Sequence, residues 1–218
     1  KNLGMEIGSP YEYRREINAC EVAMGWKDIE QPEYSVELME FNSGYADYAP
    51  RLYKDNQLVF TSDRQASVGD ETYKWTGNAF SDLFVVDLNS NDVSSFDERL
   101  NTETNEGTIA FGPGYSEVYF SRCYGPKKED AYCKLMVSEV NGDSWSPPRV
   151  LSFVQEEINY GHPSISDDGR YIAIDELDPA MKNRKIHLTD TQDDTSFVVL
   201  HDTTSGWINY SLAELAFA

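Results

Sequence analysis

Two aspartates and a glycine lie between two apolar runs in the stretch HPSISDDGRYIAI, residues 162–174. Neighbouring carboxylates can bind calcium, or supply the acid and base of sugar cleavage. Asp-Gly between two apolar strands is also a strong hairpin signal, because glycine adopts positive φ without steric cost. The sialidase Asp-box, Ser-x-Asp-x-Gly-x-x-Trp, fails at its first position, where Ile165 stands. We therefore interpret Asp167–Asp168–Gly169 as a structural turn that binds no metal.

The other residues with reactive side chains match no familiar site. The three cysteines contain no CxxC pair, and the three histidines form neither HxxxH nor HExxH. This excludes a four-cysteine zinc site and the common zinc-enzyme patterns. The nucleophile motif GxSxG is absent as well. His162, which precedes Pro163, is interpreted as a hydrogen-bonded core or rim group rather than a base. We predict no catalytic residue, no metal and no cofactor.

The net charge of the chain argues against nucleic acids and anionic membranes as binding partners. The chain has 38 acidic and 18 basic residues, a net charge of −20. Such a field repels nucleic acid and anionic membrane surfaces. No run of 18 apolar residues occurs, so no membrane span is predicted. The chain starts at Lys1 and ends in the apolar SLAELAFA, which leads us to expect a piece of a longer polypeptide.

A pattern of short strands is repeated three times along the sequence, and it places the residues described above. The alternating stretches DLFVVDL, KLMVSEV and KIHLTDT start at 82, 134 and 185. Each is preceded by a hairpin-like pair and followed by one more short apolar run. The hairpins span 48–62, 108–122 and 162–174, and the short runs span 93–100, 145–151 and 196–200. Four strands in about 50 residues are typical of propeller blades, which bury both faces by radial stacking.

The sequence thus predicts an all-β fold, a β-propeller of four-stranded antiparallel blades that forms an incomplete ring. Residues 34–218 hold three full units and a partial fourth, and 1–33 hold a helical end of a repeat region with a linker. The full units span 42–100, 101–151 and 152–200. The Asp-Asp-Gly turn then takes the place of residues 54–56 and 112–114, which lack a paired acid, and this supports a structural turn.

Residues before the first unit also have patterns. Helical spacing of Ile17, Cys20, Ala23 and Met24 predicts a short N-terminal helix over 11–26, with Cys20 as a small buried thiol. Residues 34–41, YSVELMEF, are expected to form an outermost strand ahead of the first unit.

Cys123 and Cys133 flank a short loop at the ends of two strands expected to be antiparallel neighbours. In an oxidising compartment they can form a disulfide, which would contribute about 3 kcal/mol through loop entropy. The alternative is two free thiols.

Candidate binding residues precede or open the innermost strands, whose loops meet at one mouth of a propeller channel. A long insert, 65–79, adds two aromatic side chains. An acidic, tyrosine-bearing mouth suits a basic or amide-rich peptide, and ordinary loop polarity is the alternative. The candidates are Tyr45, Asp47, Tyr48, Tyr73, Trp75, Asn105, Glu106, Tyr160 and His162.

The stretches GHPSISDDGRYIAI and NSGYADYAPRLYKDNQLVFTSDRQ resemble the PD-type propeller repeat of TolB-like proteins. The pattern in the third unit is carried by Pro163, Ser164, Ser166, Asp168, Gly169 and Arg170. The first unit keeps Pro50, Phe60, Ser62 and Arg64 without the Ser-Pro-Asp-Gly turn, and the second has Ala110 in place of the proline. The resemblance covers about 34–200.

With the preceding ACEVAMGWKDIEQPEYSVELMEF, the chain is similar to OmpA-family envelope proteins of Bacteroidetes, with PorE-like components of type IX secretion as the nearest match. This resemblance implies a non-enzymatic periplasmic scaffold, associated with the outer membrane, whose partners are other envelope or secretion-machine proteins. It implies contact with peptidoglycan only through an OmpA-like domain absent from these residues. The alternatives are a stand-alone TolB-like peptide-binding propeller and a propeller glycoside hydrolase, which needs carboxylates gathered around the channel.

Overall fold

The computed structural model describes residues 10–27, 35–127, 131–179, 183–193 and 195–202. The chain divides into two units, Lys1–Met39 and Glu40–Ala218. The described part of the first unit contains one helix, α2 (Pro10–Lys27), and this confirms the predicted helix. The prediction of a buried Cys20 is wrong, because its side chain is exposed. Ile17, Val22, Met24 and Trp26 are 40–67% exposed.

The predicted outermost strand over 34–41 is also wrong. Residues 35–39 have no regular structure, and Glu40–Phe41 form a turn. Val36 and Leu38 are 97% and 88% exposed. A strand needs a neighbour for its backbone hydrogen bonds, and none of the described strands pairs with this segment. Its last residue, Phe41, packs instead on Phe60, with 5.9 Å between ring centroids.

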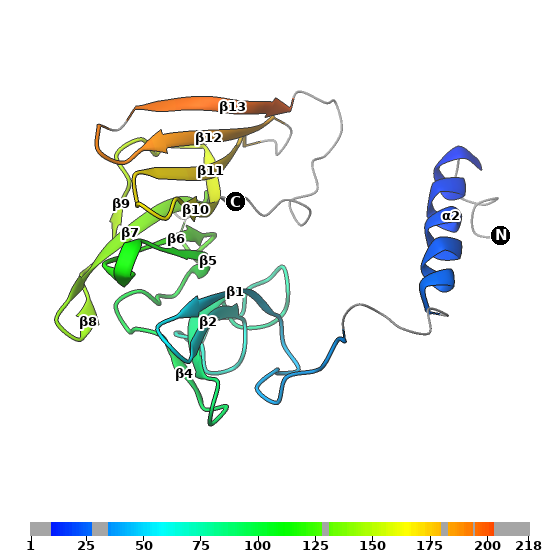
Figure 1. The fold of residues 1–218 in the computed structure, drawn as a ribbon, viewed down its shortest axis with the longest axis horizontal. Coiled ribbons are helices and arrows are strands. Elements are labelled where there is room, and N and C mark those ends of the chain that lie inside the picture. The colour runs from blue at the N-terminus through cyan, green and yellow to red at the C-terminus, as the bar shows by residue number, and fades with distance from the viewer. Residues whose placement is uncertain (1–9, 28–34, 128–130, 180–182, 194, 203–218) are drawn as a thin grey trace. The chain divides into compact units, whose positions relative to one another are not determined.

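The second unit consists of three consecutive antiparallel sheets whose strand order follows the chain (Figure 1). The first sheet contains β1 (Asp47–Tyr53), β2 (Gln57–Ser62), β3 (Asp82–Asp87) and β4 (Val93–Ser95). The second contains β5 (Asn105–Phe111), β6 (Glu117–Cys123), β7 (Lys134–Asn141), β8 (Ser144–Trp145) and β9 (Arg149–Val150). The third contains β10 (Asn159–Ile165), β11 (Tyr171–Leu177), β12 (Arg184–Asp190) and β13 (Ser196–Asp202). These are the blades of a β-propeller, and the predicted fold class is confirmed.

The outermost strands of the first two blades are shorter than the sequence pattern predicts. β4 has three residues, and the run over 145–151 is divided between β8 and β9, which both pair with β7. Pro147 and Pro148 separate these two pieces, since proline has no N–H to donate to a ladder. The expected partial fourth unit lies mainly in residues 203–218, outside the described residues.

The hydrophobic core lies between neighbouring blades. Val59 and Leu83 of the first blade pack with Phe120 and Trp145 of the second. On the other side of the second blade, side chains from β5, β6 and β7 pack with β10 and β11. This second cluster consists of Ala110, Tyr119, Leu135, Val137, Tyr160, Ile172 and Ile174. Both faces of the middle sheet are therefore buried, as radial stacking requires.

Each innermost strand contains a β-bulge at the same place. The registers shift between Tyr48 and Arg51, between Gly107 and Ala110, and between Gly161 and Ser164. The bulged residues are Ala49, Thr108 and His162, with φ of 51°, 49° and 50°. A non-glycine residue in this left-handed region is strained, especially a β-branched one such as Thr108. Bulges redirect side chains next to functional sites.

The Asp-Asp-Gly stretch forms the turn between β10 and β11, as the hairpin pattern predicts. Asp168 Oδ1 accepts hydrogen bonds from the Ser166 hydroxyl at 2.7 Å and the Arg170 N–H at 3.0 Å. These bonds lower the pKa of Asp168. Gly169 has φ of 73°, and a Cβ at this position would lie 2.7 Å from Pro113 Cδ in the turn of the second blade.

Candidate functional site: a pocket at the channel mouth

A cavity of about 360 Å³ opens where the innermost strands of all three blades begin. Its lining joins the starts of β1, β5 and β10 to the ends of β6 and to the insert before β3. Six of the nine predicted binding residues line it, namely Tyr48, Tyr73, Asn105, Glu106, Tyr160 and His162. The sequence pattern therefore brings together residues that are more than 100 positions apart.

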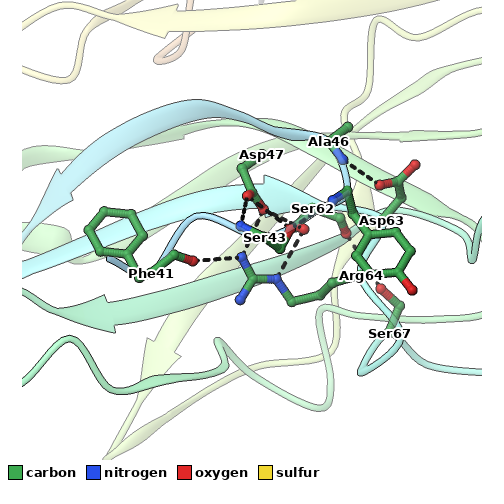
Figure 2. Close-up of polar contacts among 9 residues, drawn as sticks. Phe41, Ser43, Ala46, Asp47, Ser62, Asp63, Arg64 and Ser67 are labelled. Carbon is green, nitrogen blue, oxygen red and sulfur yellow. Dashed lines mark hydrogen bonds and ion pairs between the residues drawn. The ribbon is translucent and has the colours of Figure 1, made fainter. Parts of the chain in front are cut away.

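The other three predicted residues do not line the cavity. Tyr45 is 36% exposed beside it, and Trp75 is 88% exposed on the insert. Asp47 is held in the wall by polar contacts (Figure 2). Its carboxylate accepts bonds from the Ser62 hydroxyl at 2.7 Å and from Arg64 Nη2 at 2.8 Å. The Ser43 N–H and hydroxyl bind its other oxygen at 2.7 and 2.9 Å.

These contacts set the charge state of Asp47. Burial on its own would raise its pKa, but the hydrogen bonds from Ser43, Arg64 and Ser62 outweigh it and lower the pKa to about 2. The Arg64 guanidinium also lies over the rings of Phe60 and Phe84, at 5.0 and 5.1 Å from their centroids. Asp47 therefore fixes the segment that leads into β1 and does not face a ligand.

Glu106 is fully buried within the cavity wall. Its Oε1 accepts bonds from Arg122 Nε at 2.7 Å and from the hydroxyls of Thr102 and Thr104 at 2.6 and 2.7 Å. Burial raises the pKa of Glu106, while Arg122 and the threonines oppose the shift. Four donors, with the Thr102 N–H on Oε2, satisfy a carboxylate, so Glu106 is a structural anion of the wall.

Asp82, at the start of β3, has far fewer partners. Its Oδ2 accepts the Val68 N–H at 2.6 Å, and its Oδ1 has no hydrogen-bond partner among the described residues. Burial raises its pKa to about 7, and the neighbouring charge of Glu106 adds to the shift. Val68 belongs to the insert that carries Tyr73, so Asp82 holds the base of this insert.

His162 lines the cavity from the bulge of β10. Its Nδ1 lies 3.0 Å from Asp175 Oδ2, and Asp175 is fully buried. Arg184 binds both oxygens of Asp175, through Nε at 2.8 Å and Nη2 at 2.7 Å. The bidentate arginine neutralises Asp175 and fixes the orientation of the imidazole.

Four tyrosines give the cavity its aromatic character: Tyr48, Tyr73, Tyr124 and Tyr160. Burial raises the pKa of each hydroxyl, so all four stay neutral donors at physiological pH. The Tyr124 hydroxyl donates to Asn159 Oδ1 at 3.3 Å. Tyrosine combines an apolar ring with a polar end, which suits a surface that recognises peptides.

A disulfide between Cys123 and Cys133 forms part of the wall, with 4.1 Å between the Cα atoms. It joins the end of β6 to the residue before β7. The Tyr160 N–H donates to the Cys133 carbonyl at 2.9 Å, and the Cys133 N–H donates to Asn159 Oδ1 at 3.0 Å. These two hydrogen bonds of the Cys133 backbone connect the second blade to the start of the third.

Several lining residues escaped the sequence analysis. Asp63 and Ser121 lie at or just beyond the ends of β2 and β6. A signal was available, because in an antiparallel pair the second strand ends beside the start of the first. Tyr124 comes directly after the end of β6 and therefore also lies beside the start of β5, in the lining of the cavity. Within the described part of the chain, no three His, Cys, Asp or Glu side chains are grouped to hold a metal ion. No described helix has the length and apolar character needed to cross a membrane.

No family model and no curated protein matches the chain. A solved prolyl endopeptidase structure aligns with a TM-score of 0.50 and 15% identity, covering 81% of this chain and 24% of that one. This likeness shows the fold alone. Oligogalacturonate lyase in complex with manganese gives 0.46 at 16% identity, covering 74% and 43%. The oligogalacturonate lyase of Vibrio parahaemolyticus gives 0.43 at 17%, covering 67% and 39%. The chain spans less than half the length of each of these structures.

Proposed function

We propose that this β-propeller is a non-enzymatic interaction domain that binds an extended segment of a partner protein at its channel mouth. The observation that carries the proposal is the cavity of about 360 Å³, lined from all three blades. This volume falls in the range of ligand pockets, and it is large enough for side chains of a peptide. Tyr48, Asn105 and Tyr160 supply the aromatic and amide groups typical of peptide recognition.

The state of the acidic groups favours binding over catalysis. A general acid or base has to gain or lose a proton during the reaction. Glu106 is ion-paired with Arg122, and Asp175 is held by both Arg184 and His162. Removing the charge from either carboxylate would leave the half-buried Arg122 or the buried Arg184 without its counter-ion, which is unfavourable. These groups therefore serve to hold the wall in place.

The location and the larger assembly are part of the same proposal. A disulfide persists in oxidising compartments, so Cys123–Cys133 supports a periplasmic protein associated with the outer membrane. The resemblance to PorE-like and other OmpA-family proteins supports a scaffold within a type IX secretion or gliding machine. Peptidoglycan would be reached through a domain outside these 218 residues.

Selection of a random peptide library on the immobilised chain tests this proposal. Ala46 is an exposed residue of the lining, so Ala46→Trp fills the cavity. Ala66→Trp places the same side chain at an exposed position of the insert outside the lining, and it is the matched control. We expect the selected peptides to bind the natural chain and the control, and to lose at least about tenfold in affinity on Ala46→Trp.

Peptides that bind Ala46→Trp as well as the natural chain would show that the cavity is not the binding site. Hydrolysis or β-elimination of polysaccharides or peptides by the purified chain would overturn the non-enzymatic part of the proposal.

A further inference from the structure

The charges around the cavity are unbalanced. No lysine or arginine is among the described residues that line it. Of its two carboxylates, Glu106 is neutralised by Arg122 at 2.7 Å. Asp63, only 3% exposed, accepts the Ala46 N–H at 2.8 Å on Oδ1 and Asn78 Nδ2 at 2.9 Å on Oδ2. No ion pair joins Asp63 to a described basic residue. Its carboxylate therefore leaves an uncompensated negative charge in the wall.

Aromatic rings surround the same part of the cavity. Tyr48, Tyr73 and Tyr124 line the same cavity as Asp63. These three tyrosines come from β1, from the insert and from the loop after β6, so they approach the space from different directions. The Tyr73 ring is supported by Phe80, with 5.2 Å between the centroids. The faces of aromatic rings carry partial negative charge and attract cations.

We infer that the pocket binds a positively charged nitrogen group, a lysine or arginine side chain of the partner segment, between the tyrosine rings and Asp63. This inference rests on the proposed function and specifies what the pocket recognises. A cationic side chain supplies the counter-charge that the Asp63 carboxylate lacks, and a neutral side chain does not. The net charge of −20 also attracts cationic ligands to the surface.

Isothermal titration of the full chain with five synthetic peptides tests the inference. The probes are acetyl-Gly-Gly-Xaa-Gly-Gly-amide with lysine, arginine, acetyl-lysine, norleucine or glutamate as Xaa. Acetyl-lysine and norleucine keep the length of lysine and remove its charge. We expect lysine or arginine to bind roughly tenfold more tightly than the two neutral probes, and glutamate to bind least. Raising the salt concentration should weaken the binding of the cationic probes alone.

Variants of the chain test which residues cause the preference for cationic probes. Asp63→Asn removes the charge, and Tyr73→Leu removes a ring from the insert while keeping an apolar side chain. Both should reduce the preference for lysine over norleucine. Asp70→Asn changes an exposed aspartate of the insert that does not line the cavity, so it should leave the preference unchanged. Thermal unfolding of each variant verifies that it is folded, and Tyr73→Leu remains informative if Asp63→Asn is unstable.

The outcomes separate the inference from the proposed function. Equal binding of charged and neutral probes that is lost on Ala46→Trp would overturn the cation preference and leave the peptide-binding pocket intact. Tighter binding of glutamate would overturn the preference as well. Binding of the lysine probe that is unaffected by Ala46→Trp would overturn both proposals, as would the absence of binding by every probe and every library peptide.

Discussion

The buried acids of this protein fall into two kinds, according to whether an arginine accompanies them. Asp47, Glu106 and Asp175 bind Arg64, Arg122 and Arg184, respectively. Each of these pairs lies close to the end of a blade that forms the channel mouth. Asp82 has no such partner among the described residues, and its raised pKa of about 7 follows from its burial next to Glu106. Between about pH 4 and pH 8, Asp82 is therefore expected to make the stability depend on pH.

Stability should fall as the pH rises, because Asp82 has a higher pKa in the folded protein than in the unfolded chain. Between pH 3.8, the ordinary pKa of an aspartate in the unfolded chain, and about pH 7, Asp82 keeps its proton in the folded state. The stabilisation is thus complete below pH 3.8 and is lost as the pH rises through about 7. Asp82→Asn mimics the protonated group, so it should be more stable than the natural chain at pH 8, by on the order of 3 kcal/mol.

Urea unfolding between about pH 4 and pH 8 measures this difference, with exposed Asp70→Asn as the control. If the natural chain and Asp82→Asn had the same pH dependence, Asp82 would not carry a shifted pKa.

At the scale of elements, each hairpin turn is determined partly by its own residues and partly by the turn of the next blade. The β10–β11 turn is closed by Asp168 and reaches the second blade at Gly169, next to Pro113. The hydrogen bonds of Asp168 can be kept by a side chain of the same shape. At Gly169, by contrast, the positive φ and the short distance to Pro113 leave no room for a Cβ.

Gly169→Ala should therefore destabilise the protein by about 1–3 kcal/mol, through strain at φ of 73° and contact with Pro113. The double variant Asp167→Asn/Asp168→Asn keeps the acceptor oxygen at 168 and should have little effect on stability or on peptide binding. Thermal unfolding compares the two. A calcium-dependent rise in the melting temperature, lost in the double variant, would contradict a purely structural turn.

The disulfide loop is a second element with a measurable contribution. Closing the loop between Cys123 and Cys133 restricts the unfolded chain and should stabilise the fold by about 3 kcal/mol. Mass spectrometry of the unreduced protein should show one linked pair, with Cys20 alone reacting with an alkylating reagent. Cys123→Ser/Cys133→Ser should unfold at lower urea concentration and bind peptide less well, since the bridge lines the cavity. A link involving Cys20 would contradict the strand arrangement.

Strands with alternating apolar and polar residues could be predicted from the sequence. Segments whose structure depends on contacts with residues far along the chain could not. The runs at 82–88, 134–140 and 185–191 form third strands because both of their edges are paired. YSVELMEF has a similar pattern but lacks a neighbour, and Pro147–Pro148 shortens an outer strand. In the site, strand starts such as Asn105 and Tyr160 were predictable. The position of Asp47 outside the cavity lining was not predictable, because it depends on a hydrogen bond from Arg64, which lies 17 residues later in the sequence.

At the scale of the molecule, the second unit contains all of its own hydrophobic clusters. A chain that starts at Glu40 should keep the stability of the full chain, because it retains Phe41, Ser43 and Asp47. A chain that starts at Tyr48 loses the contacts of Phe41, Ser43, Ala46 and Asp47 drawn in Figure 2 and leaves Arg64 without its carboxylate. It should be less stable by on the order of 3 kcal/mol.

Urea unfolding of the two shortened chains gives this comparison directly. Equal stability of both would mean that the segment leading into β1 contributes nothing to the propeller, contrary to the bonding of Asp47.

The three left-handed bulges have a consequence for how this pocket would change over evolutionary time. Glycine would adopt the φ of about 50° at Ala49, Thr108 and His162 with less strain, by on the order of 1 kcal/mol at each position. Selection for stability alone would therefore favour glycine at these positions, which would remove the side chains of Thr108 and His162 from the cavity. Lineages that still need the ligand should keep side chains at 108 and 162, and lineages that have lost it should accumulate glycine there. Position 49, outside the lining, should drift in both.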